Sequence, residues 1–130
     1  MKRDNWEALC AAYVQNLGAN FCDKANAYMQ CLHWYPDTFE DQTGLSRTTY
    51  QRICHGKNEN PDKGTVMALC VGLGLDCHMT TDLLRSAGYV LSSTINTDKA
   101  YAYLLLMYHG QGLEFFNREL EARGEKILGK

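Results

Sequence analysis

Long apolar runs are missing from this chain of 130 residues. A helix that spans a bilayer needs about 20 consecutive apolar residues, and the longest apolar stretch here, AYAYLLLMY, is far shorter. The N-terminal stretch MKRDNWEALC also lacks the apolar segment and the small-residue cleavage site of a signal peptide. We therefore expect no contact with a membrane and a cytoplasmic location.

Signatures of catalysis and of bound metal are absent as well. The sequence contains no Gly-rich phosphate loop, no H-E-x-x-H and no G-x-S-x-G motif, so we expect no enzyme and no cofactor. Its six cysteines include no C-x-x-C pair, whereas structural zinc sites usually show such paired spacing. The nearest approach is Cys70, Cys77 and His78, with Cys54 and His55 upstream. We expect buried, reduced thiols and no metal site.

The chain also lacks an excess of positive charge. The chain has 13 Lys and Arg against 15 Asp and Glu, which gives a formal net charge of −2. Proteins gain sequence-independent affinity for DNA mainly by neutralising phosphates with Lys and Arg. We therefore expect only weak sequence-independent affinity for DNA.

What the sequence does contain is helical periodicity, without the alternation that marks strands. Apolar residues recur at helical spacing, and Asn, Ser, Asp, Pro and Gly stand where helices begin or end. The pattern predicts an all-α fold with helices over residues 5–17, from the cap Asn20 to about 32, from Pro36, over 47–55, between Asp62 and Gly74, over 80–88, over 98–109 and over 113–123, with a connector at 89–97.

One stretch, TGLSRTTYQRICHG at residues 43–56, indicates two helices joined by a tight turn. Gly44 permits a left-handed backbone, and Ser46 can accept N–H bonds at the start of the second helix. Phe39, Tyr50 and Ile53 are placed to hold the two helices together. This order is that of a helix-turn-helix, whose second helix enters the major groove of DNA.

Residues 36–75 resemble the XRE, or lambda-repressor-like, helix-turn-helix family. The resemblance rests on FEDQTGLSRTTYQRI, GKNENPD and TVMALCVGLGL, which follow one another at the family's spacing. It implies a lambda-repressor-like bundle of five helices over residues 20–88 and sequence-specific binding of double-stranded DNA. Residues 1–19 then form an extra N-terminal helix, and residues 89–130 form a C-terminal helical extension that resembles the tail of bacterial regulators with this domain.

The resemblance also implies which residues contact DNA. Arginine can bond guanine in a bidentate fork, and glutamine can do the same for adenine. Side chains on the second helix reach bases and nearby phosphates, while the following loop and the first helix hold the backbone. The residues implied are Arg47, Thr48, Gln51 and Arg52 on the second helix, Lys57 and Asn58 in the loop, and Thr38 on the first helix.

Two carboxylates depart from the family pattern. Glu40 stands where a small residue is usual, and it must either point into solvent or pair with an arginine such as Arg47 or Arg52. Asp37, in the first turn of its helix, favours the helix dipole but repels phosphate. Residues 36–75 carry four Lys and Arg against five acids, a net charge of −1. An alternative function is therefore a protein-interaction module that keeps the fold: an antitoxin, an adaptor or a mobile-element inhibitor.

The C-terminal helix pair has more apolar residues than one helix face can hold. A helix that is apolar all round must be buried, and exposed apolar patches mark interaction sites. We therefore expect a twofold homodimer that reads an inverted repeat through two recognition helices. The residues expected at its interface are Leu105, Leu106, Met107, Phe115 and Phe116.

Overall fold

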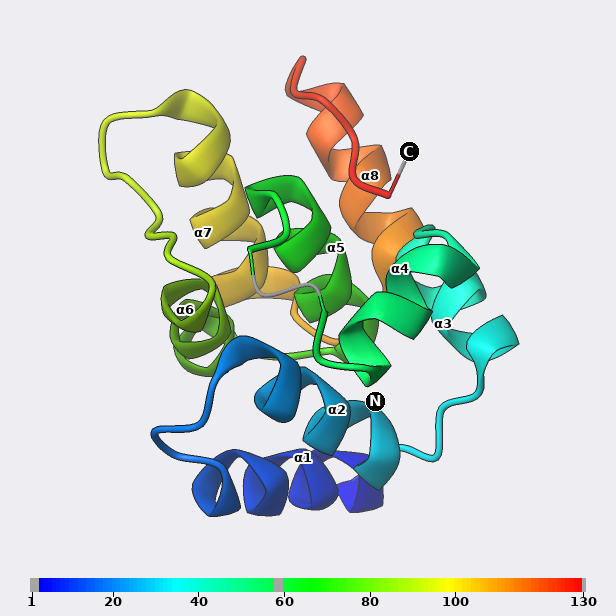
Figure 1. The fold of residues 1–130 in the computed structure, drawn as a ribbon. Helices are drawn as coiled ribbons and strands as arrows, with labels where there is room; N and C mark the ends of the chain where they lie inside the picture. The colour runs from blue at the N-terminus through cyan, green and yellow to red at the C-terminus, as the bar shows by residue number, and fades with distance from the viewer. Residues whose placement is uncertain (1–2, 58–59, 130) are drawn as a thin grey trace.

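The computed structural model describes residues 3–57 and 60–129, and this part of the chain forms helices and no strand (Figure 1). The all-α class expected from the sequence is confirmed. The described helices are α1 (Arg3–Gln15), α2 (Phe21–Cys31), α3 (Pro36–Thr43), α4 (Arg47–Cys54), α5 (Lys63–Leu73), α6 (Cys77–Ser86), α7 (Asn96–Tyr108) and α8 (Leu113–Ala122).

Most helix ends lie where the capping residues predict them. The side chain of Asn20 accepts a hydrogen bond from the Asp23 N–H at 2.9 Å and starts α2. Asp62 accepts from the Thr65 N–H at 2.7 Å at the start of α5. These bonds satisfy backbone donors that have no partner within the first helical turn.

Besides α1, which begins at Arg3 rather than at residue 5, two helix starts differ from expectation. The α6 helix begins earlier, at Cys77, because Asp76 caps it by accepting from the Met79 N–H at 2.9 Å. The α7 helix begins at Asn96, so neither Asn96 nor Thr97 is its cap. Buried Asp98, in the first turn of α7, accepts from Lys63 Nζ at 2.7 Å and from the Ser92 N–H at 2.8 Å, which ties α7 and the connector to the start of α5.

The α5 helix lies at the centre of the bundle. Seven of its eleven residues are buried, including Val66, Leu69 and Leu73, as expected of a helix that has neighbours on most sides. Figure 1 shows α1 and α2 side by side below it, α6 and α7 on one side, and α3, α4 and α8 on the other. Leu9 of α1 and Phe116 of α8 belong to the same buried cluster as α5, so the flanking segments share one core with residues 20–88.

The last described residues, drawn in red, fold back along α8 towards the α3–α4 turn (Figure 1). The Asn117 amide anchors them, because it donates to the Leu128 carbonyl at 2.9 Å and accepts from the Leu128 N–H at 2.8 Å. Gly129 packs on the turn so closely that a Cβ added to it would lie 2.4 Å from the Thr43 carbonyl oxygen. The C-terminal segment thus forms part of the support of α3.

Among the described helices, none combines the length and the apolar character required to cross a membrane.

Candidate nucleic-acid interface

The α3–α4 turn has the geometry that its sequence predicts. Gly44 adopts a left-handed backbone with φ +69°, and its N–H donates to the Glu40 carbonyl. The Thr43 hydroxyl donates to the Phe39 carbonyl at 2.7 Å and accepts from the Leu45 N–H at 3.1 Å. The turn is therefore closed by hydrogen bonds on both sides of the glycine, and it fixes the direction in which α4 leaves α3.

Aromatic and aliphatic packing holds α4 against α3. Phe39 and Ile53 are fully buried, and the rings of Phe39 and Tyr50 lie 5.2 Å apart. Trp34 packs on the other edge of Phe39 at 6.4 Å. The inner face of α4 is thus fixed to the core, which leaves its outer face open for a ligand.

The outer face of α4 is polar. The Ser46 hydroxyl caps the helix by accepting from the Thr49 N–H at 3.2 Å, and Thr48, Gln51 and Arg52 are exposed beyond it. These three lie three and four residues apart, so they share one side of the helix. The structure therefore brings together three of the residues that the sequence implied for base contact.

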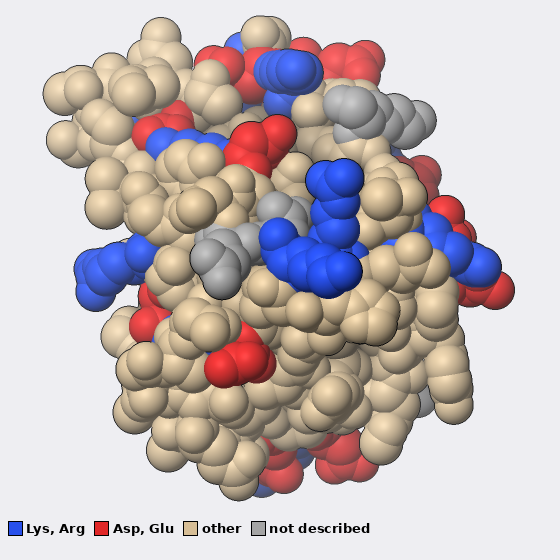
Figure 2. Space-filling model, in the orientation of Figure 1, with Lys and Arg blue, Asp and Glu red and all other residues tan. Residues whose placement is uncertain are grey.

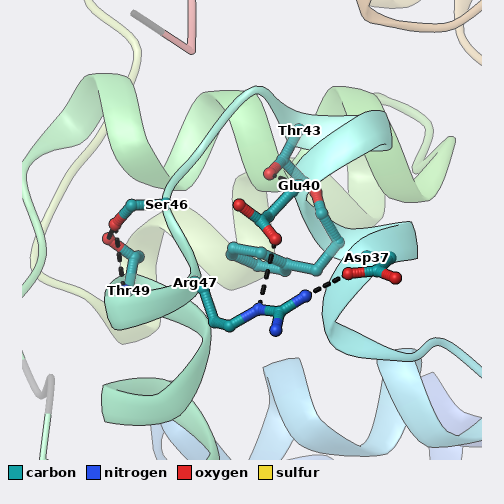
Figure 3. Close-up of polar contacts among 7 residues, drawn as sticks. Asp37, Glu40, Thr43, Ser46, Arg47 and Thr49 are labelled. Atoms are coloured by element: carbon teal, nitrogen blue, oxygen red, sulfur yellow. Dashed lines mark hydrogen bonds and ion pairs between the residues drawn. The ribbon is translucent and has the colours of Figure 1, made fainter.

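Arg47 differs from these three, because carboxylates from α3 occupy its guanidinium group (Figure 3). Its Nε donates to Glu40 Oε1 at 3.2 Å, and its terminal nitrogen donates to Asp37 Oδ1. Of the two positions that the sequence left open for Glu40, the structure shows the ion pair, and the partner is Arg47. We call Asp37, Glu40 and Arg47 the arginine clamp.

The clamp is a surface feature. The exposed fractions of its side chains are 84% for Asp37, 41% for Glu40 and 50% for Arg47. Ion pairs at such exposure contribute about 0–1 kcal/mol to stability, since solvent screens them. Its larger effect is on charge, because two carboxylates against one guanidinium leave a net −1 beside the N-terminal end of α4.

The other DNA contacts implied by the sequence are Lys57, Thr38 and Asn58. Lys57 is exposed just beyond α4. Thr38 is half-buried, and its hydroxyl accepts from the Tyr35 N–H at 3.4 Å. It lines a hollow of about 240 Å³ with Leu32, Trp34 and the end of α5, away from the exposed side chains of α4. Asn58 lies outside the described residues.

The outer face of α4 and the start of the loop after it carry few charged side chains. Within the described chain, Arg52 and Lys57 have no ion-pair partner. With Arg47 they give three cations against the two carboxylates of the clamp, a net of +1. Figure 2 accordingly shows separate small groups of blue side chains rather than a continuous basic surface. Sequence-independent attraction to phosphate must be weak here.

Three of the five residues expected at a dimer interface are buried or half-buried within the chain itself. Leu105 and Phe116 are almost completely buried within the chain itself, at 1% and 2% exposure. Their side chains complete the core, so they are not available to a second copy in this conformation. Phe115 is half-buried and packs on Tyr108, with the ring centres 5.1 Å apart.

Leu106 and Met107 are exposed, together with Tyr103 one turn earlier on α7. The guanidinium of Arg123 lies 5.4 Å from the centre of the Tyr103 ring. We call Tyr103, Leu106 and Met107 the α7 apolar strip. Of the five residues expected at the interface, Leu106 and Met107 are the two that are exposed, and Tyr103 adds to the apolar surface beside them.

The thiols are dispersed. No group of three or more metal-ligating side chains occurs among residues 3–57 and 60–129. Cys22 and Cys70 are buried, while Cys54 is exposed at the end of α4. Burial raises the pKa of the Cys70 thiol from 9.0 to about 12, since the core disfavours the thiolate.

The sequence pattern marked Asp37 and Glu40 as two separate departures from the family, not as two partners of one arginine. Residues three apart on a helix share a face, so their spacing was the available signal. The turn then decides which arginine meets that face.

Comparison with models of protein families, with curated proteins and with solved structures finds no match.

Proposed function

We propose that the chain is a sequence-specific DNA-binding regulator that places α4 in the major groove. The observation that carries the proposal is the exposed polar face of Thr48, Gln51 and Arg52 on a helix whose opposite face is packed into the core. A helix of this size fits the major groove, and Gln and Arg have the donors that read adenine and guanine there.

The support for α4 also fits this function. Base readout needs side chains held in a fixed direction, and the hydrogen-bonded turn and the Phe39–Tyr50 packing provide that direction. The resemblance of residues 36–75 to XRE-type helix-turn-helix proteins agrees with the same use of α4.

The proposal includes a twofold dimer through the α7 apolar strip. One recognition helix contacts only a few base pairs, and each mismatch costs about 1–3 kcal/mol, so a single copy discriminates poorly within a genome. Leu106 and Met107 are 70% and 54% exposed, and apolar side chains that adjoin one another on one helix are candidates for burial against a second copy. The preferred site is then an inverted repeat with half-sites about 34–36 Å apart.

A second candidate function is a protein-interaction module. The arginine clamp favours it, because the clamp removes one cation from the face that would meet phosphate. In that case α4 or the α7 apolar strip would bind another protein, and DNA affinity would be weak for every sequence.

Selection of bound duplexes from a random DNA library distinguishes the DNA-binding regulator from the protein-interaction module. The full-length protein should enrich one motif, and binding to that motif should exceed binding to mixed duplexes by at least about 10³-fold. Arg52→Ala should then relax the preference at one base position. If repeated rounds enrich no motif, DNA recognition is the wrong function, and the interaction module takes its place.

A further inference from the structure

The arginine clamp joins the first half of α3 to Arg47, the first residue of α4, and helix N-termini are the ends at which phosphate groups are usually bound. The guanidinium of Arg47 is held by carboxylates on α3, 3.2 Å from Glu40 Oε1 and in contact with Asp37 Oδ1 (Figure 3). Arg47 therefore points back across the turn to α3, whereas Thr48, Gln51 and Arg52 are exposed on α4.

We infer that the arginine clamp is an electrostatic brake on sequence-independent DNA binding. Asp37 and Glu40 take Arg47 out of phosphate neutralisation, so that affinity depends on the hydrogen bonds made by Thr48, Gln51 and Arg52. This inference rests on the proposed function, and it assigns Arg47 a role other than base contact.

The physical reason is the balance of charge at the site. Each Lys or Arg that neutralises a phosphate releases counterions and steepens the fall of affinity with salt. With Arg47 occupied, Arg52 and Lys57 are the cations on this face that have no ion-pair partner among the described residues. A genome offers an excess of non-specific sites that compete for a regulator, so a low affinity for arbitrary duplex leaves more of the protein for its target.

The test is to release Arg47 without removing it. In Asp37→Asn/Glu40→Gln the side chains keep their size and lose their charge, so Arg47 becomes available to phosphate. One added phosphate contact steepens the slope of log K against log salt by about 0.9. If that contact is lost at 1 M salt, mixed duplexes should bind about 15-fold more tightly at 50 mM salt and about 4-fold more tightly at 200 mM.

The matched control is Asp4→Asn/Glu7→Gln on α1. It makes the same two chemical changes and the same change in net charge, and it releases Arg3, whose Nε lies 3.1 Å from Glu7 Oε1. Because α1 is a different helix from α3 and α4, which carry the clamp, this control changes the net charge of the protein without releasing Arg47. A third variant adds Arg47→Ala to Asp37→Asn/Glu40→Gln, and it should lose the gain in affinity.

Binding is measured by fluorescence anisotropy with mixed duplexes and with the duplex selected by the wild type, and circular dichroism verifies that each variant is folded. A gain for Asp37→Asn/Glu40→Gln alone, abolished by Arg47→Ala, supports the brake. An equal gain in the α1 control, or no gain in either, overturns it while leaving the proposed function intact if the wild type still binds its selected duplex. If the wild type selects no duplex but the clamp variant binds mixed DNA, the brake stands and the proposed function fails.

Discussion

Gly72 lies where α5 approaches the end of α3 closely, and replacing it by alanine should destabilise the protein. A Cβ at this position would lie 2.6 Å from the Gln42 carbonyl oxygen and 2.9 Å from Thr43 Cγ2. Real Cβ atoms do not approach backbone this closely, so α3 or α5 must move. The movement would reach the turn that directs α4.

The expected magnitude follows from two opposing effects. Alanine in a helix is favoured over glycine by about 1 kcal/mol, whereas overpacking a close-packed site costs about 1–3 kcal/mol or somewhat more. The upper part of that range applies, because the obstacle is backbone and because Gly129 supports the other side of Thr43. Gly72→Ala should therefore lower the free energy of unfolding by about 1–2 kcal/mol.

Gly64 in the same helix supplies the control. The nearest atom to a Cβ there is Asp62 Oδ1, at an ordinary 3.6 Å, so Gly64→Ala should raise stability by up to about 1 kcal/mol. Urea denaturation followed by circular dichroism measures both changes. The reasoning is refuted if Gly72→Ala is as stable as the wild type, or if both substitutions shift stability in the same direction.

Three further outcomes are expected. Arg52→Ala should cost about 1–3 kcal/mol on the selected duplex and relax one base position, whereas Lys57→Ala should weaken binding evenly across sequences; equal, sequence-independent losses from both would mean that Arg52 contacts only phosphate. Burial raises the pKa of Cys70 to about 12, so above about pH 9 the unfolded chain releases this proton while the folded chain retains it, and stability is lost as pH rises from about 9 towards 12. The urea midpoint of Cys70→Ala should therefore fall less over this pH range than that of the wild type. An identical fall in both proteins would assign the effect to other groups. Leu106→Glu should give a folded monomer with much weaker DNA binding, measured by sedimentation at micromolar concentration; a wild type that already sediments as a monomer and binds one non-palindromic site tightly would refute the dimer.

The sequence predicts helices well wherever a local signal sets an end. Asn20, Ser46 and Asp62 cap their helices through hydrogen bonds to a residue three positions on, which is short-range chemistry. The start of α7 has no such signal. Its N-cap residue, Ile95, makes no side-chain cap hydrogen bond, and Asp98 in its first turn instead accepts from Lys63, which lies 35 residues earlier in the chain.

The same distinction holds at the candidate interface. The exposure of Thr48, Gln51 and Arg52 follows from helical spacing and could be predicted. The burial of Leu105 and Phe116 could not, because the sequence shows a surplus of apolar groups without showing which of them the core receives. Leu106 is exposed although its neighbour Leu105 is buried, because adjacent residues on a helix point in directions about 100° apart.

The direction of α4 depends on parts of the chain outside the helix-turn-helix motif. Gln42 at the end of α3 lies against Gly72, and Thr43 lies against Gly129, with no room for a methyl group at either contact. The end of α3 is thus held between α5 and the C-terminal segment, and α4 follows α3 through a turn closed by hydrogen bonds. The C-terminal extension therefore contributes to the candidate interface even though none of its residues lies on the outer face of α4, because it restricts the angle at which that face is presented.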